Sequence, residues 1–188
     1  ADDWSAHWIG SAEMESQSVG GRPVDNKMFD PWFRKTFTLT ESLKEALIYV
    51  ASIGYHELYV NGCKIGNAVL APSVTDHKSR ARYVTYDISH YLKKGENVIA
   101  LWLGTSWAVF PAYQRNDKPA IPMALAQAEI TLTSGSKVRV ITDGSWKTHA
   151  SPNVLMGYWD AHHFAGEFYD ASLEINGWNE AGFDDSEW

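Results

Sequence analysis

The sequence has 188 residues, a formal net charge of −7 at pH 7 and a 45% share of hydrophobic residues. This length and composition fit one domain with a sizeable core, or one domain with extensions. Lysine and arginine do not gather into a basic stripe, so a nucleic-acid partner is not expected. No apolar run approaches the roughly 18 residues of a membrane span, so we expect no membrane partner.

Aromatic residues are abundant, with nine Trp, nine Tyr and seven Phe. Such an excess fits a β-rich core, in which most single rings are buried. It also fits carbohydrate binding, because the C–H patches of sugars stack on aromatic faces while their hydroxyls need polar partners. The single cysteine, Cys63, excludes an internal disulfide and has no companions for a metal site. We interpret it as a small residue in or beside a strand.

The first strands are expected where short runs of β-branched and aromatic residues stand between turn residues. Phe33–Thr40 alternates, which places Arg34 on the polar face of that strand. Leu47–Ile53 is nearly all apolar, which is typical of a strand buried on both faces. Tyr55–Val60 runs into Asn61-Gly62, a hairpin signal because both turn residues tolerate the positive φ of a type I′ turn.

The chain continues in the same manner. A returning strand is expected over Lys64–Leu70, and another over Tyr83–Asp87. Asp87 is placed to cap a short helical turn that ends at Gly95. Three further strands are expected at Asn97–Leu103, Ala124–Leu132 and Lys137–Thr142.

No segment longer than about one turn shows helical periodicity. Many short strands with regular turns favour an all-β fold, an antiparallel β-sandwich of the jelly-roll, galactose-binding-like type. We therefore expect an N-terminal arm and first-strand region over 1–32 and the β-sandwich module over 33–188. Ser11–Pro31 and Trp107–Pro122 lack periodicity and are expected to be long loops, the usual carriers of function. A further strand is expected near Trp188, so we expect the chain to be cut there.

A series of short motifs covers nearly the whole chain from Trp8 onward. In order, the motifs are Trp8-Ile9-Gly10, Phe33–Phe37, Gly54–Gly66, Val69–Pro72, Thr75-Asp76, Tyr83–Asp87, Gly95–Val98, Leu103–Trp107, Gly166–Ala171 and Gly177–Ser186. This order resembles the N-terminal β-sandwich region of the α-L-rhamnosidases of glycoside hydrolase family 78. It is also similar to the family 67 carbohydrate-binding modules.

The resemblance implies a part of a bacterial enzyme that removes terminal α-L-rhamnose with inversion. The catalytic carboxylates of such enzymes lie on a separate (α/α)₆ barrel, and the amphipathic helices of a barrel are missing here. We therefore expect no catalytic residue in this chain and no enzyme activity from it alone. The resemblance also implies two partners, a rhamnose-containing carbohydrate and the rest of the parent enzyme. An extracellular or periplasmic location is favoured over a cytoplasmic one.

Two loops carry side chains suited to a sugar. Trp107, Tyr113 and Arg115 would form a stacking platform beside a guanidinium; the alternative is a rim aromatic packed beneath the loop. The second loop supplies Trp159, Asp160 and His162 as sugar contacts, with an ordinary loop as the alternative. Its adjacent histidines have no third ligand at a typical spacing, so we expect no transition-metal site.

Calcium is the cofactor that the resemblance implies, because some modules of this region bind L-rhamnose with its help. Asp76 and Glu167 are its candidate ligands, and Asp76 is also suited to accept hydrogen bonds from sugar hydroxyls. The alternatives are an Asx turn at Asp76 and turn or cap hydrogen bonds at Glu167. Asp184-Asp185 has the composition of a calcium pair, but a turn that enters another strand is the simpler interpretation.

The sequence leaves two functions open. The first is a carbohydrate-binding module that recognises L-rhamnose or a rhamnose-bearing glycan, favoured by the family resemblance and by the aromatic and acidic loops. The second is a structural accessory domain that packs against the catalytic barrel without binding sugar. Thr105-Ser106 before Trp107 favours the second, because related sequences often have Asn-Gly or Asp-Gly there.

Overall fold

The structure is a computed structural model, and it describes residues 3–11, 30–77, 79–104, 121–156 and 166–188. Within these ranges no helix is long and apolar enough to cross a membrane. Trp107, Tyr113, Arg115, Trp159, Asp160 and His162 lie outside the described residues.

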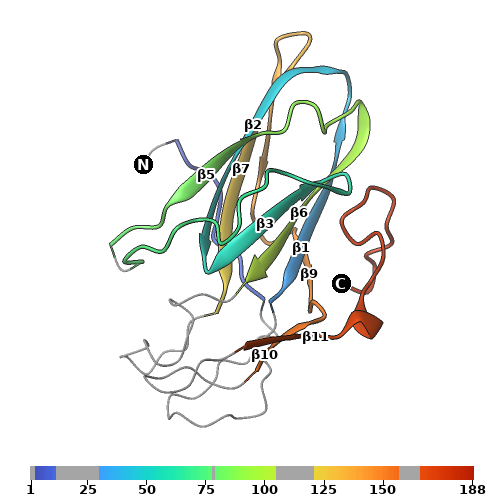
Figure 1. Cartoon of the computed structure of the whole chain (residues 1–188). Helices are drawn as coiled ribbons and strands as arrows, with labels where there is room; N and C mark the ends of the chain where they lie inside the picture. The colour runs from blue at the N-terminus through green and yellow to red at the C-terminus, as the bar shows by residue number, and fades with distance from the viewer. Residues whose placement is uncertain (1–2, 12–29, 78, 105–120, 157–165) are drawn as a thin grey trace.

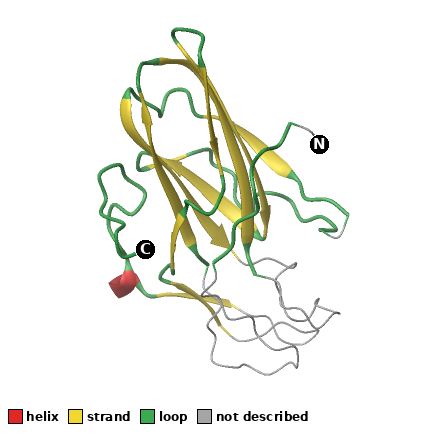
Figure 2. Ribbon diagram, turned by 180° about the vertical axis from the view of Figure 1, so that it is seen from behind, coloured by secondary structure: helices red, strands yellow, loops and turns green. Residues whose placement is uncertain are grey.

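Two antiparallel sheets form a sandwich (Figures 1 and 2). The five-stranded sheet has the order β4 (Cys63–Lys64), β3 (Tyr55–Val60), β6 (Gly95–Gly104), β1 (Trp32–Leu39) and β9 (Lys147–His149). The four-stranded sheet has the order β5 (Tyr83–Asp87), β2 (Leu43–Ile53), β7 (Met123–Leu132) and β8 (Lys137–Ile141). The all-β antiparallel sandwich predicted from the sequence is confirmed.

A third, two-stranded sheet pairs β10 (Asn153–Met156) with β11 (Gly166–Tyr169). It lies across one end of the sandwich, at the bottom of Figure 1. The chain then forms a 3₁₀ turn, η2 (Ala171–Leu173), which Asp170 caps by accepting from the backbone N–H of Ser172. Strands β9, β10 and β11 were not predicted from the sequence, and each has only three or four residues.

The core lies between the two large sheets and consists of their inward-facing side chains. Strand β7 contributes Ala124, Ala126 and Ala128, which are almost completely buried, as the alternation in its sequence predicts. Leu58 and Leu101 belong to the same cluster from the facing sheet. Full burial of one such leucine stabilises the fold by roughly 1.5–3 kcal/mol.

Two strand predictions and one helical-turn prediction need correction. Strand β2 begins at Leu43, and along its first half only one face is buried, so Leu47 remains 38% exposed. The expected strand Lys64–Leu70 is reduced to Cys63–Lys64, because Gly66 has a left-handed φ of 76° and the chain leaves the sheet. Gly95 begins β6 rather than ending a helix, although Asp87 does cap a single turn by accepting from the N–H of Ser89 at 2.9 Å.

Arg34 is a fourth correction, because its side chain is only 1% exposed instead of lying on a solvated face. The C-terminal segment packs on the outer face of the five-stranded sheet, where Trp178, Ile175 and Trp188 cluster with Trp32 of β1 and Ala100 of β6. Arg34 pairs there with the carboxylate of Asp185, donates to the carbonyl of Glu180 at 2.9 Å and lies over the ring of Phe183. The C-terminal segment is therefore part of the packed structure.

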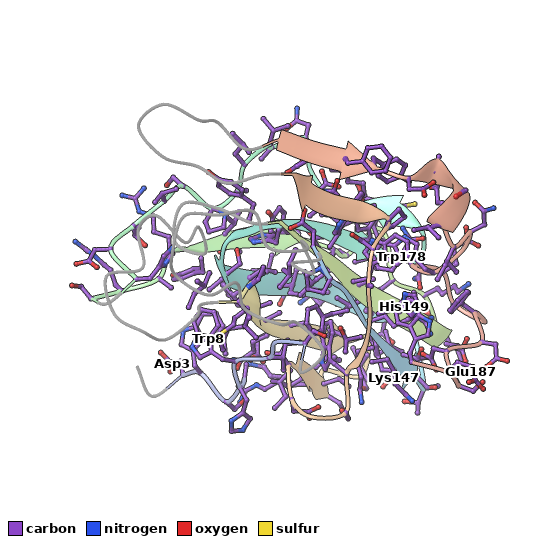
Figure 3. The ribbon with its side chains drawn as sticks, turned by 90° about the horizontal axis from the view of Figure 1, so that it is seen from below. Asp3, Trp8, Lys147, His149, Trp178 and Glu187 are labelled. Atoms are coloured by element: carbon purple, nitrogen blue, oxygen red, sulfur yellow. The ribbon has the colours of Figure 1, made fainter. Side chains whose placement is uncertain are left out.

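Asp184-Asp185 forms a turn, in which the N–H of Ser186 donates to Asp184 at 3.1 Å. The simpler interpretation of this pair as a turn fits these contacts, although no strand follows within the described chain. Figure 3 shows Trp178 and Glu187 of the C-terminal segment on one side of the module and Asp3 and Trp8 on the other.

Candidate functional site

A cleft of about 450 Å³ lies where the outer face of β3 and β6 meets the β10–β11 sheet. The β10–β11 sheet lies below the two large sheets, at one end of their strands (Figure 1). The residues that line the cleft are Asp30, Tyr55, His56, Glu57, Ala68, Val69, Leu70, Trp102, Leu103, Gly104, Asn153, Glu167 and Tyr169.

Cross-strand pairs of β3 and β6 form one wall of the cleft. Trp102 lies directly opposite Glu57, and Tyr55 lies directly opposite Gly104. These residues face outward because Leu58 and Leu101, at alternate positions, face the core. A Cβ at Gly104 would lie 3.6 Å from the Cβ of Tyr55, so glycine keeps the cross-strand space beside Tyr55 open.

Strand β11 forms the facing wall. Glu167 and Tyr169 line the cleft, whereas Phe168 between them points away and is 53% exposed. The ring of Tyr169 stands 6.4 Å from that of Trp102, with an angle of 44° between their planes. Asn153 lies directly opposite Tyr169 in β10. At this separation the two rings are in contact, so aromatic side chains from two different sheets meet at the cleft.

A carboxyl–amide pair is buried at the base of the cleft. Asp30 is 4% exposed and Asn153 is 7% exposed. Nδ2 of Asn153 donates to Oδ2 of Asp30 at 2.5 Å. Buried polar groups are stable only when hydrogen-bonded, so this pair keeps an oriented polar surface in place beside the aromatic walls.

Glu57 is held in a fixed position by two donors. Its Oε2 accepts from the hydroxyl of Tyr59 at 2.6 Å, and its Oε1 pairs with the ammonium of Lys64. Burial raises the pKa of Tyr59, and the hydrogen bond to Glu57 raises it further. The described lining contains three acidic side chains and no lysine or arginine, so the cleft disfavours anionic ligands.

The rim of the cleft is apolar. Val69 and Leu70 expose 79% and 66% of their surface. Leu70 has a φ of 55°, a left-handed conformation that bulky residues rarely adopt. The backbone N–H of His56 donates to the carbonyl of Ala71 at 2.8 Å and fastens this loop to β3.

Of the two predicted site residues that the structure describes, Asp76 and Glu167, Glu167 lines this cleft. Asp76 is absent from the lining and lies in a turn, where it accepts from the hydroxyl and the backbone N–H of Ser79. Sequence reasoning missed Asp30, Trp102 and Asn153. The sequence does indicate one side of the cleft: Tyr55 and Glu57 alternate with Leu58, which predicts that the strand turns a polar and aromatic face outward.

Calcium is the cofactor that the resemblance implied, with Asp76 and Glu167 as its candidate ligands. Calcium takes roughly six to eight oxygen ligands. Among the residues that the structure describes, no group of three or more His, Cys, Asp or Glu side chains could hold a metal ion. Calcium binding by Asp76 and Glu167 therefore stays a prediction.

Residues 41–188 match the family described as Alpha-L-rhamnosidase N-terminal domain. An α-L-rhamnosidase of Formosa agariphila is 31% identical over 193 residues, which cover 99% of this chain and 20% of that protein. The solved α-L-rhamnosidase from Dictyoglumus thermophilum gives a TM-score of 0.84 at 35% identity and covers 100% of this chain and 20% of that one. The Streptomyces avermitilis α-L-rhamnosidase, solved with L-rhamnose, gives 0.76 at 28% identity, with 85% and 15% coverage.

The chain spans about a fifth of the length of the curated relatives it matches first. With a family match over most of its length and relatives at 31% identity over 99% of it, the chain belongs to the family of α-L-rhamnosidase N-terminal domains.

Proposed function

We propose that the chain is a non-catalytic accessory module of an inverting α-L-rhamnosidase and that it binds L-rhamnose or rhamnose-bearing glycans in the cleft. The observation that carries the proposal is the pairing of aromatic walls, Trp102 and Tyr169, with the buried Asp30–Asn153 pair. Sugars need both an apolar face for their C–H groups and oriented acceptors and donors for their hydroxyls.

The apolar rim suits a deoxy sugar in particular. L-Rhamnose carries a methyl group in place of a hydroxymethyl group, and Val69 and Leu70 offer it an apolar surface. Asp30 and Glu167 would accept hydrogen bonds from ring hydroxyls, while the ring stacks on Trp102. The Streptomyces avermitilis relative, which was solved with L-rhamnose, supports this class of ligand.

A catalytic role for the cleft is not part of the proposal. An inverting glycosidase needs a protonated carboxylic acid and a second carboxylate that activates water. Glu57 is unsuited to be the acid, because its two carboxylate oxygens are already engaged by the Tyr59 hydroxyl and the Lys64 ammonium and neither is free to meet a glycosidic oxygen. We place the catalytic pair in another part of the parent enzyme.

A second function, packing against the catalytic barrel without binding sugar, is favoured by exposed apolar side chains near the cleft. Phe168 and Leu173 are largely exposed, as are Val69 and Leu70. Apolar groups that gather on a surface mark sites of protein association. In this alternative the rest of the enzyme would cover them.

Isothermal titration with L-rhamnose separates the two functions. If the module binds sugar, the titration should give heat at millimolar L-rhamnose, and Trp102→Ala should abolish that heat. Tyr91→Ala is the control and should bind as the wild type does, because Tyr91 is an exposed tyrosine outside the cleft. Repeating the titration with calcium and then with a chelator tests the predicted cofactor. No heat under any of these conditions would remove the first function for the monosaccharide and leave the structural one.

A further inference from the structure

A second hollow, of about 450 Å³, lies on the outer face of the four-stranded sheet, on the opposite side of the sandwich from the face that forms the cleft wall. Its lining is Asp3, Trp4, Tyr49, Tyr83, Gln127, Glu129 and Arg139. From this surface we propose a second ligand site, which binds a neutral oligosaccharide and does not depend on the cleft.

The strand register aligns the lining side chains in a row across the sheet. Tyr49 of β2 lies directly opposite Gln127 of β7, and Glu129 of β7 lies directly opposite Arg139 of β8. Tyr83 of β5 stands opposite Ala51, two residues from Tyr49 along β2. All point outward, since the alternate positions of β2 and β7 are in the core.

Three aromatic rings form one end of the row. Trp4 stands edge to face with Tyr49 and Tyr83, with ring centroids 6.2 and 5.7 Å apart, and the two tyrosines are 6.0 Å apart. Tyr83 is 56% exposed, so much of its surface remains accessible to a ligand. An exposed aromatic platform of this kind offers a face to the C–H patch of a sugar ring.

A fixed hydrogen-bonding group forms the other end. Gln127 is nearly buried; it accepts from the N–H of Ser5 at 2.8 Å and donates to the carbonyl of Asp3 at 2.9 Å. Its amide also donates to Oε1 of Glu129 at 2.8 Å, and the same oxygen accepts from Nε of Arg139 at 2.6 Å. The N-terminal segment and the sheet thus hold the charged pair in place.

The arrangement leaves polar atoms for a ligand. Within the part of the chain that the structure describes, Oε2 of Glu129 and Nη2 of Arg139 have no hydrogen bond. One carboxylate oxygen and one guanidinium N–H group beside an aromatic platform match the hydroxyls and the C–H face of a neutral sugar. Asp3 and Glu129 against a single arginine make the hollow slightly acidic, which disfavours an anionic polymer.

The site goes beyond the proposed function, because it lies on the other sheet and involves none of the residues that line the cleft. Two sites on one module would engage a polymer at two points and raise its apparent affinity without any new contact at either site. The ligand class here is a neutral polysaccharide chain, whether or not it carries rhamnose.

Affinity gel electrophoresis tests the proposal with three soluble neutral polysaccharides, xyloglucan, galactomannan and β-1,4-galactan, and with polygalacturonate as the anionic comparison. We expect retardation by at least one neutral polymer. Tyr83→Ala should weaken it about tenfold, the equivalent of one stacked ring. Arg139→Gln should also weaken the retardation, although the three aromatic rings remain in place. Trp102→Ala and Tyr91→Ala should leave the retardation unchanged.

Both Tyr83 and Arg139 are exposed, so these variants are expected to fold, and thermal unfolding checks this. The proposal is overturned by no retardation in any neutral polymer, by retardation in polygalacturonate alone, or by a folded Tyr83→Ala that migrates like the wild type. If Trp102→Ala abolishes retardation while Tyr83→Ala does not, the polymer binds in the cleft and the second site does not exist.

Discussion

Trp32 and Trp178 stack face to face, with ring centroids 4.5 Å apart and 9° between their planes. The ring of Trp188 stacks on the ring of Trp32, with centroids 6.3 Å apart, and on the imidazole of His149, with centroids 4.9 Å apart. This aromatic stack fastens the C-terminal segment to the outer face of β1, beside the strands that form the cleft wall. The segment therefore contributes to the stability of the sheet on which the proposed sugar site is built.

Trp178→Ala should be strongly destabilising. The side chain is 8% exposed, and truncation of a buried tryptophan costs about 3–5 kcal/mol. The free energy of unfolding from urea denaturation measures the effect. Leu173→Ala in the same segment is the matched control, since that side chain is exposed and should change stability by less than about 0.5 kcal/mol. Equal effects of the two variants would contradict the packed arrangement.

Asp185→Ala should leave the buried guanidinium of Arg34 without its carboxylate. We expect a loss of about 3 kcal/mol in unfolding free energy, because an uncompensated buried charge is costly. The double variant Arg34→Met/Asp185→Ala should be more stable than Asp185→Ala alone, as the charge is then absent. A double variant whose loss equals the sum of the single losses would show that the two residues do not interact.

His56 makes the stability of the module dependent on pH. Its imidazole lies between the Ser52 hydroxyl at 2.9 Å and the Tyr86 hydroxyl at 3.0 Å. Burial lowers its pKa from 6.5 to about 4. As the pH falls, His56 therefore takes up a proton near pH 6.5 in the unfolded chain but only near pH 4 in the folded protein.

Unfolding free energy should thus be fully maintained above pH 6.5 and should fall as the pH drops toward 4, by up to about 3 kcal/mol. Denaturation curves at pH 7 and pH 4.5 measure the loss. His56→Gln should be less stable than the wild type at pH 7 and should lose less on acidification. An identical pH dependence in the two proteins would exclude His56 as the cause.

Gly54→Ala should destabilise the end of β3 at the cleft. Gly54 has a φ of 104°, and a Cβ there would clash with the carbonyl oxygen of Gly104, a lining residue. We expect a loss on the order of 3 kcal/mol in unfolding free energy. Gly95→Ala is the matched control, with a φ of 96° and open space around its Cβ, and should cost only about 1–2 kcal/mol. Equal losses of unfolding free energy in Gly54→Ala and Gly95→Ala would mean that the close approach of Gly54 to the Gly104 carbonyl does not affect stability.

Much of the fold could be predicted from the sequence, because strands such as Tyr55–Val60 and Tyr83–Asp87 are determined by local alternation and adjacent turns. The burial of Arg34 could not, since it depends on a segment about 150 positions later in the chain. Of the residues that line the cleft, the sequence analysis named Glu167, and named it as a calcium ligand. Trp102 was missed because its strand looks like a core strand, and Asp30 because its place at the cleft depends on contact with the distant Asn153.

If sugar binds where β11 meets the five-stranded sheet, two neighbouring aromatic residues of β11 should differ in their effect on binding. Tyr169 lines the cleft and Phe168 points away, yet both are exposed aromatic side chains. Titration of the wild type, Tyr169→Ala and Phe168→Ala with L-rhamnose should show binding in the wild type and Phe168→Ala and at least about tenfold weaker binding in Tyr169→Ala. Equal affinity in all three proteins, or a loss only in Phe168→Ala, would contradict the claim.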